Sequence, residues 1–313
     1  MAKIKPASIA AATICLGLAL PATLGAETGT KPKGTPQVDG QTSPPGLVWS
    51  LKDSDSTVYL AGSVHLLREK DMPIPAPYTL AYEAADEVFF EVDMAQMFDP
   101  ANATKMQQLS MLAEGETLAE QLGEETHQTL LDYFSGRGIP AGSFERVKPS
   151  MVYLTIAQIE AARQGARPEL GLEAQFYLRS KQDGKASSGL ETVEYQLGQF
   201  DKIPLDSVRQ LIARSIEEAD AMGEELDKMI TTWRTGDGEG LGTLVNEKMG
   251  EIEGVREALL VERNQNWVPA IIEALGKDTD VLFIVGAGHL VGDGSVIELL
   301  SEKGFEAERY SGE

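Results

Sequence analysis

Histidine is the residue whose placement in this chain first suggests chemistry. The chain contains three histidines, and two of them, His65 and His289, end the tetrapeptides GSVH and GAGH. Each tetrapeptide directly follows an apolar segment that predicts a β-strand. A glycine at the end of a strand permits a sharp turn, which leaves the histidine at the rim of the sheet, where open α/β sheets place ligand sites. We therefore expect the two histidines to meet across neighbouring strands at a metal or catalytic site.

The alternative is that the two histidines are unrelated and hydrogen-bond to loop backbone. His127, in the acidic helical segment EETHQT, is expected to be a solvated surface residue.

A carboxylate in an apolar segment completes the predicted site. Glu91 lies within VFFEV, where a charge is costly to bury unless it is paired or bound to a metal. With His65 and His289 it would form a set of two histidines and one carboxylate, as in catalytic zinc and similar divalent sites. Asp93 would face the same side of the strand and is a candidate alternative ligand or supporting partner. The alternative for Glu91 is a strand end whose carboxylate reaches solvent.

Three further polar residues are candidates. Glu173, in PELGLEAQF, is either a second active carboxylate or an ordinary residue on a helix surface. Arg263, in VERNQNW, either holds a substrate carbonyl or pairs with nearby glutamates. Glu191, in GLET, follows a predicted short strand, and both kinds of role remain open for it. The chain contains no HExxH, GxxxxGK[ST] or GxSxG motif, so zincins, Walker-type nucleotide sites and nucleophile elbows are not predicted.

Composition excludes several classes of function. The chain has 27 basic and 49 acidic side chains and a net charge of −22. Such a surface repels phosphate backbones and anionic lipid, so no nucleic-acid partner is expected. The single cysteine, Cys15, lies in the N-terminal segment, so a processed chain would contain neither a disulfide nor a thiol nucleophile.

The first residues have the layout of a secretory signal peptide. Lys3 and Lys5 precede an apolar run of 12 residues, 9–20, and small residues up to Ala26 offer a cleavage site. A membrane-spanning helix needs roughly 20 apolar residues. We therefore expect residues 1–26 to be removed on export, most consistently to a bacterial periplasm, leaving no stable membrane anchor.

The remaining chain predicts an α+β (or α/β) fold. Residues 27–46 are expected to be a flexible lead-in, followed by a single domain over 47–310 with a helical middle at about 101–280. A small central mixed sheet would be built from strands near both ends of the chain and surrounded by many helices. The expected strands are 47–51, 57–62, 87–94, 189–191, 281–289 and 305–310. The expected helices are 76–86, 117–135, 149–164, 170–182, 206–233, 239–249, 254–275 and 295–303.

Taken together, the segments LVWSL, STVYLAGSVHLL, ADEVFFEVDM, GLEAQF, SGLETVEYQLGQFD, ERNQNW and FIVGAGHLVGDG resemble the TraB/GumN family, which includes the animal TIKI proteins. The resemblance covers residues 47–310. It implies a core in which two related halves form a central sheet, and it implies metal-dependent proteolysis. The family's two GxxH motifs and its glutamate fall on His65, His289 and Glu91.

We therefore predict an exported metal-dependent hydrolase, a peptidase or amidase acting on a peptide or a small molecule. His65, His289 and Glu91 would hold a divalent ion such as zinc, manganese or cobalt, which would activate water and the carbonyl. Glu173, or a carboxylate near Glu91, would act as general base and Arg263 would stabilise the oxyanion.

Two other kinds of protein remain open. One is a non-catalytic protein that binds a metal, haem or another small ligand. The other is an accessory factor in cell-envelope or polysaccharide export. The sequence does not determine the oligomeric state.

Overall fold

The computed structural model describes residues 43–312. The predicted signal peptide, Cys15 and nearly all of the predicted lead-in lie outside the described residues. Within residues 43–312 no helix combines the length and the apolar character needed to cross a membrane.

A six-stranded mixed sheet forms the centre of the fold, in the order β4-β3-β5-β2-β1-β6. The strands are β1 (Val48–Lys52), β2 (Thr57–Ser63), β3 (Glu87–Val92), β4 (Ala186–Glu191), β5 (Val281–Gly286) and β6 (Glu308–Arg309). Four of them, β4, β3, β5 and β2, are parallel, and β1 is antiparallel to both β2 and β6. The predicted small mixed sheet is confirmed. One strand, β4, comes from the middle of the chain rather than from near its ends.

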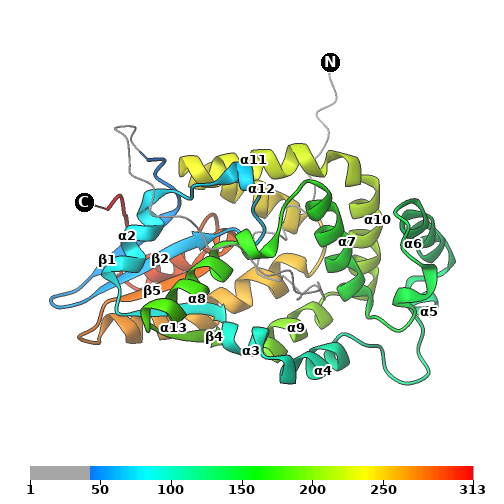
Figure 1. Ribbon diagram of the computed structural model, residues 1–313, viewed down its shortest axis with the longest axis horizontal. Helices are drawn as coiled ribbons and strands as arrows, with labels where there is room; N and C mark the ends of the chain where they lie inside the picture. The colour runs from blue at the N-terminus through cyan, green and yellow to red at the C-terminus, as the bar shows by residue number, and fades with distance from the viewer. Residues whose placement is uncertain (1–42, 313) are drawn as a thin grey trace, which may run out of the picture.

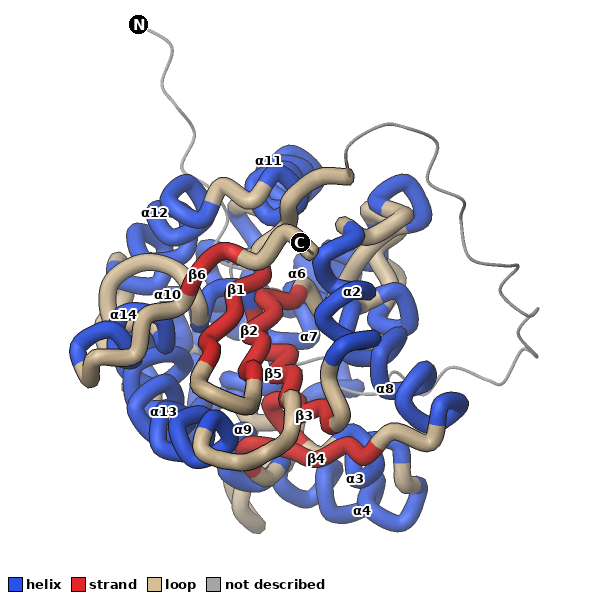
Figure 2. The backbone as a smooth tube through the Cα atoms, turned by 90° about the vertical axis from the view of Figure 1, so that its left-hand side faces the viewer, coloured by secondary structure: helices blue, strands red, loops and turns tan. Residues whose placement is uncertain are grey.

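Helices cover both faces of the sheet, as Figure 2 shows: α2 (Ala76–Ala84) and α8 (Leu172–Asp183) lie on one side, and α13 (Glu262–Leu275) and α14 (Val296–Glu302) on the other. Parallel strands covered on both faces are apolar throughout. Accordingly, all six residues of β5 are buried. The apolar run that predicted this strand therefore reflects its place at the centre of the sheet.

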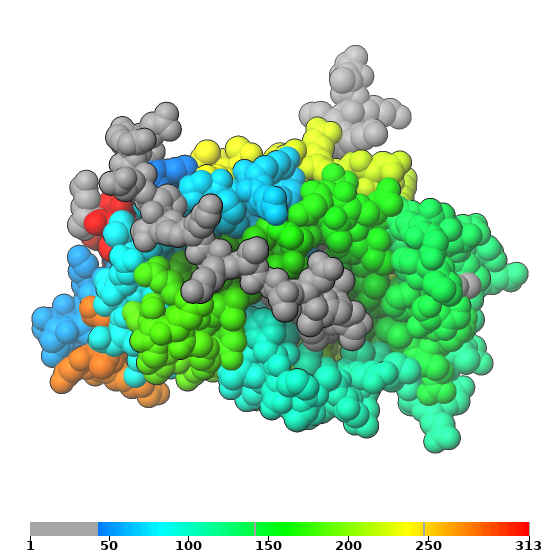
Figure 3. Space-filling view, in the orientation of Figure 1, coloured from blue at the N-terminus to red at the C-terminus, as the bar shows by residue number. Residues whose placement is uncertain are grey.

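The remaining helices extend the molecule beyond the C-terminal ends of the parallel strands (Figure 1). They are α3 (Met94–Phe98), α4 (Pro100–Leu109), α5 (Leu118–Leu122), α6 (Glu124–Gly136), α7 (Pro149–Arg163), α9 (Val193–Asp201), α10 (Leu205–Glu217), α11 (Met222–Thr235) and α12 (Gly238–Gly250). In the space-filling view, α5 and α6 form the end of the molecule opposite the sheet (Figure 3). The C-terminal ends of the parallel strands, which lead to the two histidines, therefore face these helices.

The single long helix predicted over 206–233 is wrong. The segment forms two helices, α10 and α11, separated by a turn at Ala219–Ala221. The apolar residues keep helical spacing on both sides of the turn, so periodicity alone does not reveal the break. Buried Ala219 and Met222 anchor the turn against the core.

Candidate active site

The two GxxH motifs lie side by side because β2 and β5 are adjacent parallel strands, with Ser63 paired to Gly286. As expected, the two histidines follow neighbouring strands. Glycine favours this contact: a β-carbon on Gly62 would lie 3.1 Å from both Cα and Cβ of Ala287 in the second motif, which is closer than most β-carbon contacts. The Gly62 carbonyl accepts hydrogen bonds from Trp233 Nε1, at 2.8 Å, and from a tyrosine hydroxyl. Two side-chain donors therefore hold the Gly62 carbonyl at the start of the turn that leads to His65.

Glu91 lies near the end of β3 and is buried, 3% exposed. Its Oε1 accepts the backbone N–H of Gly286 at 2.6 Å, and its Oε2 accepts from Gln196 at 2.9 Å and from Arg263 at 2.6 Å. The alternative of a carboxylate that reaches solvent is therefore wrong. The same Oε1 is 3.9 Å from His65 Nε2 and 3.8 Å from His289 Nε2. Glu91 thus stands between the two histidines.

Glu173 contacts His65 at the ring nitrogen Nδ1. Its Oε1 is 2.9 Å from His65 Nδ1 and also accepts a hydrogen bond from Ser63. The start of α8 lies directly on the His65 backbone, because a β-carbon on Gly171 would be only 2.1 Å from the His65 carbonyl oxygen. Glycine at position 171 therefore lets the first turn of α8 bring Glu173 to the histidine.

Charge pairing sets the ionisation of these two side chains. Burial raises the pKa of Glu173, but His65 and the hydrogen bonds from His65 and Ser63 outweigh it and lower that pKa below its usual value. Burial lowers the pKa of His65, but Glu173 and, more weakly, Glu91 raise it above its usual value. Both shifts favour the charged form of the side chain concerned.

Arg263 lies at the centre of the site, 2% exposed, on α13. Its Nη2 donates to Glu91 and to Glu191, each at 2.6 Å, and its Nε donates to Glu191 at 2.9 Å. Glu191 also accepts from Trp267 Nε1 at 3.0 Å. Burial raises the pKa of Glu191, although Arg263 opposes the shift. Of the two sequence alternatives, the ion pair with nearby glutamates is present. The π-helix Glu257–Val261 directly precedes this part of α13, and such turns are frequent at functional sites.

His289 is fully buried in the 3₁₀ turn Ala287–His289. Its Nδ1 is 2.6 Å from Asn264 Oδ1 and its Nε2 is 3.1 Å from Arg263 Nη1. Burial, together with the positive charges of Arg263 and His65, lowers the pKa of His289 well below its usual value. The pKa of His289 is therefore shifted in the opposite direction from that of His65.

Two residues considered from the sequence lie outside this network of contacts. Asp93 caps the N-terminus of α3, accepting from the Ala95 N–H at 2.9 Å. His127 is on α6, with its Nε2 3.7 Å from Glu145. Four residues of the network, Ser63, Gln196, Asn264 and Trp267, were given no role from the sequence. Gln196 carries a usable signal, because it lies on the helix that follows directly after the predicted strand ending at Glu191.

The donor set of the site suits a divalent cation by its chemistry. Glu91 and Glu191 contact the guanidinium of Arg263, and Glu173 contacts His65, so the cluster has three carboxylates and one arginine. Metal-binding histidines commonly donate their second N–H to a carboxylate, a backbone carbonyl or a water, and here Nδ1 of His65 and of His289 lies beside an oxygen of Glu173 and of Asn264. His65 Nε2 is buried without a hydrogen-bond partner among the described residues.

The side chains are not, however, in metal-binding positions. Within residues 43–312 no three His, Cys, Asp or Glu side chains are grouped closely enough to hold an ion. Around zinc at about 2.0–2.1 Å, tetrahedral ligand atoms lie roughly 3.3 Å apart, which is closer than the 3.8 and 3.9 Å separations here. Arg263 also bonds the nitrogen that His289 would offer. Binding an ion would therefore require the ligand atoms to move closer together and the Arg263 guanidinium to shift.

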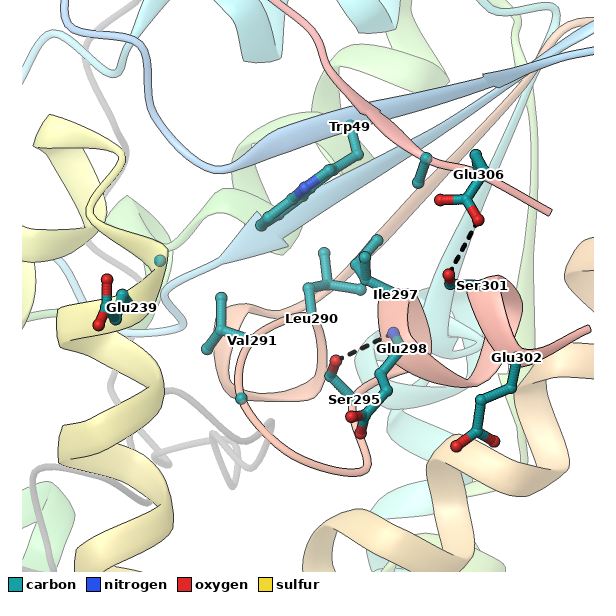
Figure 4. A pocket seen from close by; sticks show the side chains of 13 residues that line it. Trp49, Glu239, Leu290, Val291, Ser295, Ile297, Glu298, Ser301, Glu302 and Glu306 are labelled. Atoms are coloured by element: carbon teal, nitrogen blue, oxygen red, sulfur yellow. Dashed lines mark hydrogen bonds between the residues drawn. The ribbon is translucent and has the colours of Figure 1, made fainter. Parts of the chain in front are cut away.

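A separate pocket of about 560 Å³ adjoins the segment that follows His289 (Figure 4). Trp49, Leu290 and Val291 line it together with carboxylates of the C-terminal region. None of the residues that contact Glu91 line this pocket, so it is distinct from the candidate site.

The sequence that forms this fold and site matches the TraB/PrgY/gumN family. That family matches residues 47–309, and the chain belongs to it. The chain is 23% identical to Metalloprotease TIKI2 of Danio rerio, covering 80% of this chain and 58% of that protein. It is 24% identical to Metalloprotease TIKI2 of Xenopus tropicalis, covering 84% of this chain and 59% of the relative.

A bacterial relative is similar over a larger share of its own length. The protein YbaP of Escherichia coli is 23% identical, covering 77% of this chain and 87% of YbaP. The chain spans under two thirds of the length of the TIKI2 proteins. No solved structure matches the chain significantly.

Proposed function

We propose that this protein is an exported metal-dependent hydrolase that cleaves a peptide or amide bond. One observation carries the proposal. His65 Nε2 is a buried nitrogen with no hydrogen-bond partner among the described residues, and it shares Glu91 Oε1 as a neighbour with His289 Nε2. Leaving a buried polar atom unsatisfied costs about 1–3 kcal/mol. A ligand that binds this nitrogen would remove that cost.

In this proposal the residues of the cluster have different roles. His65, His289 and Glu91 would hold the ion, which when bound supplies Lewis-acid chemistry for hydrolysis. Glu173 orients His65 through Nδ1 and remains our candidate for the general base. Arg263, whose Nη1 lies beside His289 Nε2, would donate to the carbonyl oxygen of the substrate as negative charge develops on it.

The substrate class and the location rest on other support. The relatives named Metalloprotease TIKI2 favour a peptide substrate. The basic, apolar and small-residue pattern of residues 1–26 favours export, most consistently to a periplasm. The excess of negative charge in the cluster favours a divalent cation, with zinc, manganese and cobalt as candidates.

Metal content tests the site directly. Protein without a histidine tag is loaded with zinc, manganese or cobalt, dialysed and analysed by elemental mass spectrometry. We expect about one ion per chain in the wild type, loss in His65→Ala and His289→Ala, and retention in His127→Ala. The last variant is a matched control, because it removes the only other histidine of the chain. An absence of binding of all three metals by the wild type would refute the proposal.

Hydrolysis is tested separately, with a quenched fluorescent peptide library and the same variants. Metal-dependent cleavage that is lost in His65→Ala and His289→Ala supports the peptidase assignment. Metal binding without cleavage of any peptide or amide would contradict the enzyme and leave a metal-binding protein.

A further inference from the structure

We infer that Asn264 is a positioning residue that fixes His289 as the tautomer protonated on Nδ1, so that Nε2 presents its lone pair to the centre of the site. As a role in metal binding, this inference rests on the proposed function. The tautomer itself follows from hydrogen-bond geometry and can be tested without any metal.

The orientation of the Asn264 amide is set by a backbone carbonyl. Its Nδ2 donates to the Gly294 carbonyl oxygen at 2.8 Å. A carbonyl oxygen can only accept, so the NH₂ group must be on that side and Oδ1 must face His289. Oδ1 can only accept in turn, so at 2.6 Å from it His289 Nδ1 must carry the hydrogen.

The other ring nitrogen, Nε2, indicates the same tautomer independently. His289 Nε2 is 3.1 Å from Arg263 Nη1, and a guanidinium has donors but no acceptor. Nε2 must therefore accept, which excludes a hydrogen on it. Two neighbouring residues of α13 thus specify the same neutral tautomer from opposite sides of the ring.

Packing holds the ring in this orientation. Trp267, on the same helix, lies with its ring centroid 4.4 Å from that of His289. Asn264 is 2% exposed and His289 is fully buried, so solvent does not compete for the Asn264 bond. His65 is held differently, by a carboxylate, because Glu173 contacts its Nδ1.

The tautomer is measured by long-range ¹H–¹⁵N correlation on metal-free protein labelled with ¹⁵N-histidine. Only three histidines contribute, and His65→Ala and His127→Ala assign them. We expect His289 to be neutral and protonated on Nδ1 at pH 7. Protonation on Nε2, or a cationic ring at this pH, would overturn the inference whatever the protein does with metals.

The role of Asn264 is tested with Asn264→Leu and Asn264→Asp. We expect Asn264→Leu to lose the hydrogen-bonded Nδ1–H signal and to weaken zinc binding about 10–100-fold, as removal of such outer partners typically does. Asn264→Asp keeps an acceptor and should retain the tautomer. If the leucine variant does not fold, loss of the Nδ1–H signal in a folded Asn264→Asp protein would refute the role.

Asn266→Leu is the matched control, since Asn266 is an exposed residue of the same helix that donates to Tyr195 at 2.6 Å. It should match the wild type in both measurements. An unchanged His289 signal and unchanged zinc affinity in a folded Asn264→Leu protein would refute the role. If the wild type shows the expected tautomer but binds no metal, the proposed function fails and the tautomer assignment stands.

Discussion

Replacing Arg263 by methionine should strongly destabilise the protein, because the change leaves two carboxylates buried without their partner. The side chains of Glu91 and Glu191 are 4% and 5% exposed, and Arg263 donates to both at 2.6 Å. Breaking a buried ion pair by removing one member typically costs about 3–5 kcal/mol. We expect a loss of free energy of unfolding in that range. For a domain of about 150–250 residues it corresponds to a fall in Tm of roughly 6–20 °C.

Urea denaturation of metal-free protein, followed by circular dichroism, measures this loss. The double variant Arg263→Met/Glu191→Gln should be more stable than Arg263→Met, because it removes one of the two stranded charges. Lys277→Met is the control: it breaks an exposed pair with Glu273, and such pairs contribute about 0–1 kcal/mol. A loss below about 1 kcal/mol in Arg263→Met, within the range of an ordinary surface pair, would refute the reasoning.

Two further predictions concern how the site is held. Since the folded-state pKa of Glu173 is lowered from 4.5, its carboxylate stabilises the fold above that value and loses this contribution as the pH falls through the lowered pKa. Glu173→Gln should therefore be less stable than the wild type at pH 6. The free energies of unfolding of the two proteins, from denaturation curves, should converge as the pH is lowered. A difference that stays constant down to pH 2 would contradict the pairing of Glu173 with His65. Gly171→Ala places a β-carbon 2.1 Å from a backbone oxygen and should lose at least the ~1–3 kcal/mol typical of overpacking. Gly198→Ala, in a helix with open space around it, should instead gain about 0.5–1 kcal/mol; equal thermal stability of the two variants would contradict the close approach.

The sequence predicted those parts of the site that a local pattern carries. Each GxxH motif follows an apolar strand, and Glu91 is a charge within another such strand. These patterns were sufficient to expect the three residues together. Arg263 was also identified, but with two alternatives, because a helix pattern does not reveal what an arginine contacts.

Tertiary contacts account for what the sequence did not predict. Asn264 fixes its amide through the carbonyl of Gly294, which lies in a loop beyond the next strand. Gln196 reaches Glu91 only because β4 is beside β3 in the sheet. The turn that divides 206–233 was missed for a related reason. The apolar spacing continues through it, and the break is set by packing against other helices.

The position of β5 has a consequence for the order in which the molecule is made. This strand lies between β2 and β3, yet it is synthesised long after both, and Glu91 and Gly286, which it brings into contact, are 195 positions apart. Contacts of such range form late because the chain between them must first be ordered. A nascent chain emerging N-terminus first therefore has two unpaired strand edges and a divided centre until β5 inserts. The candidate site therefore cannot be complete until β5, the last strand of the parallel set, has been synthesised.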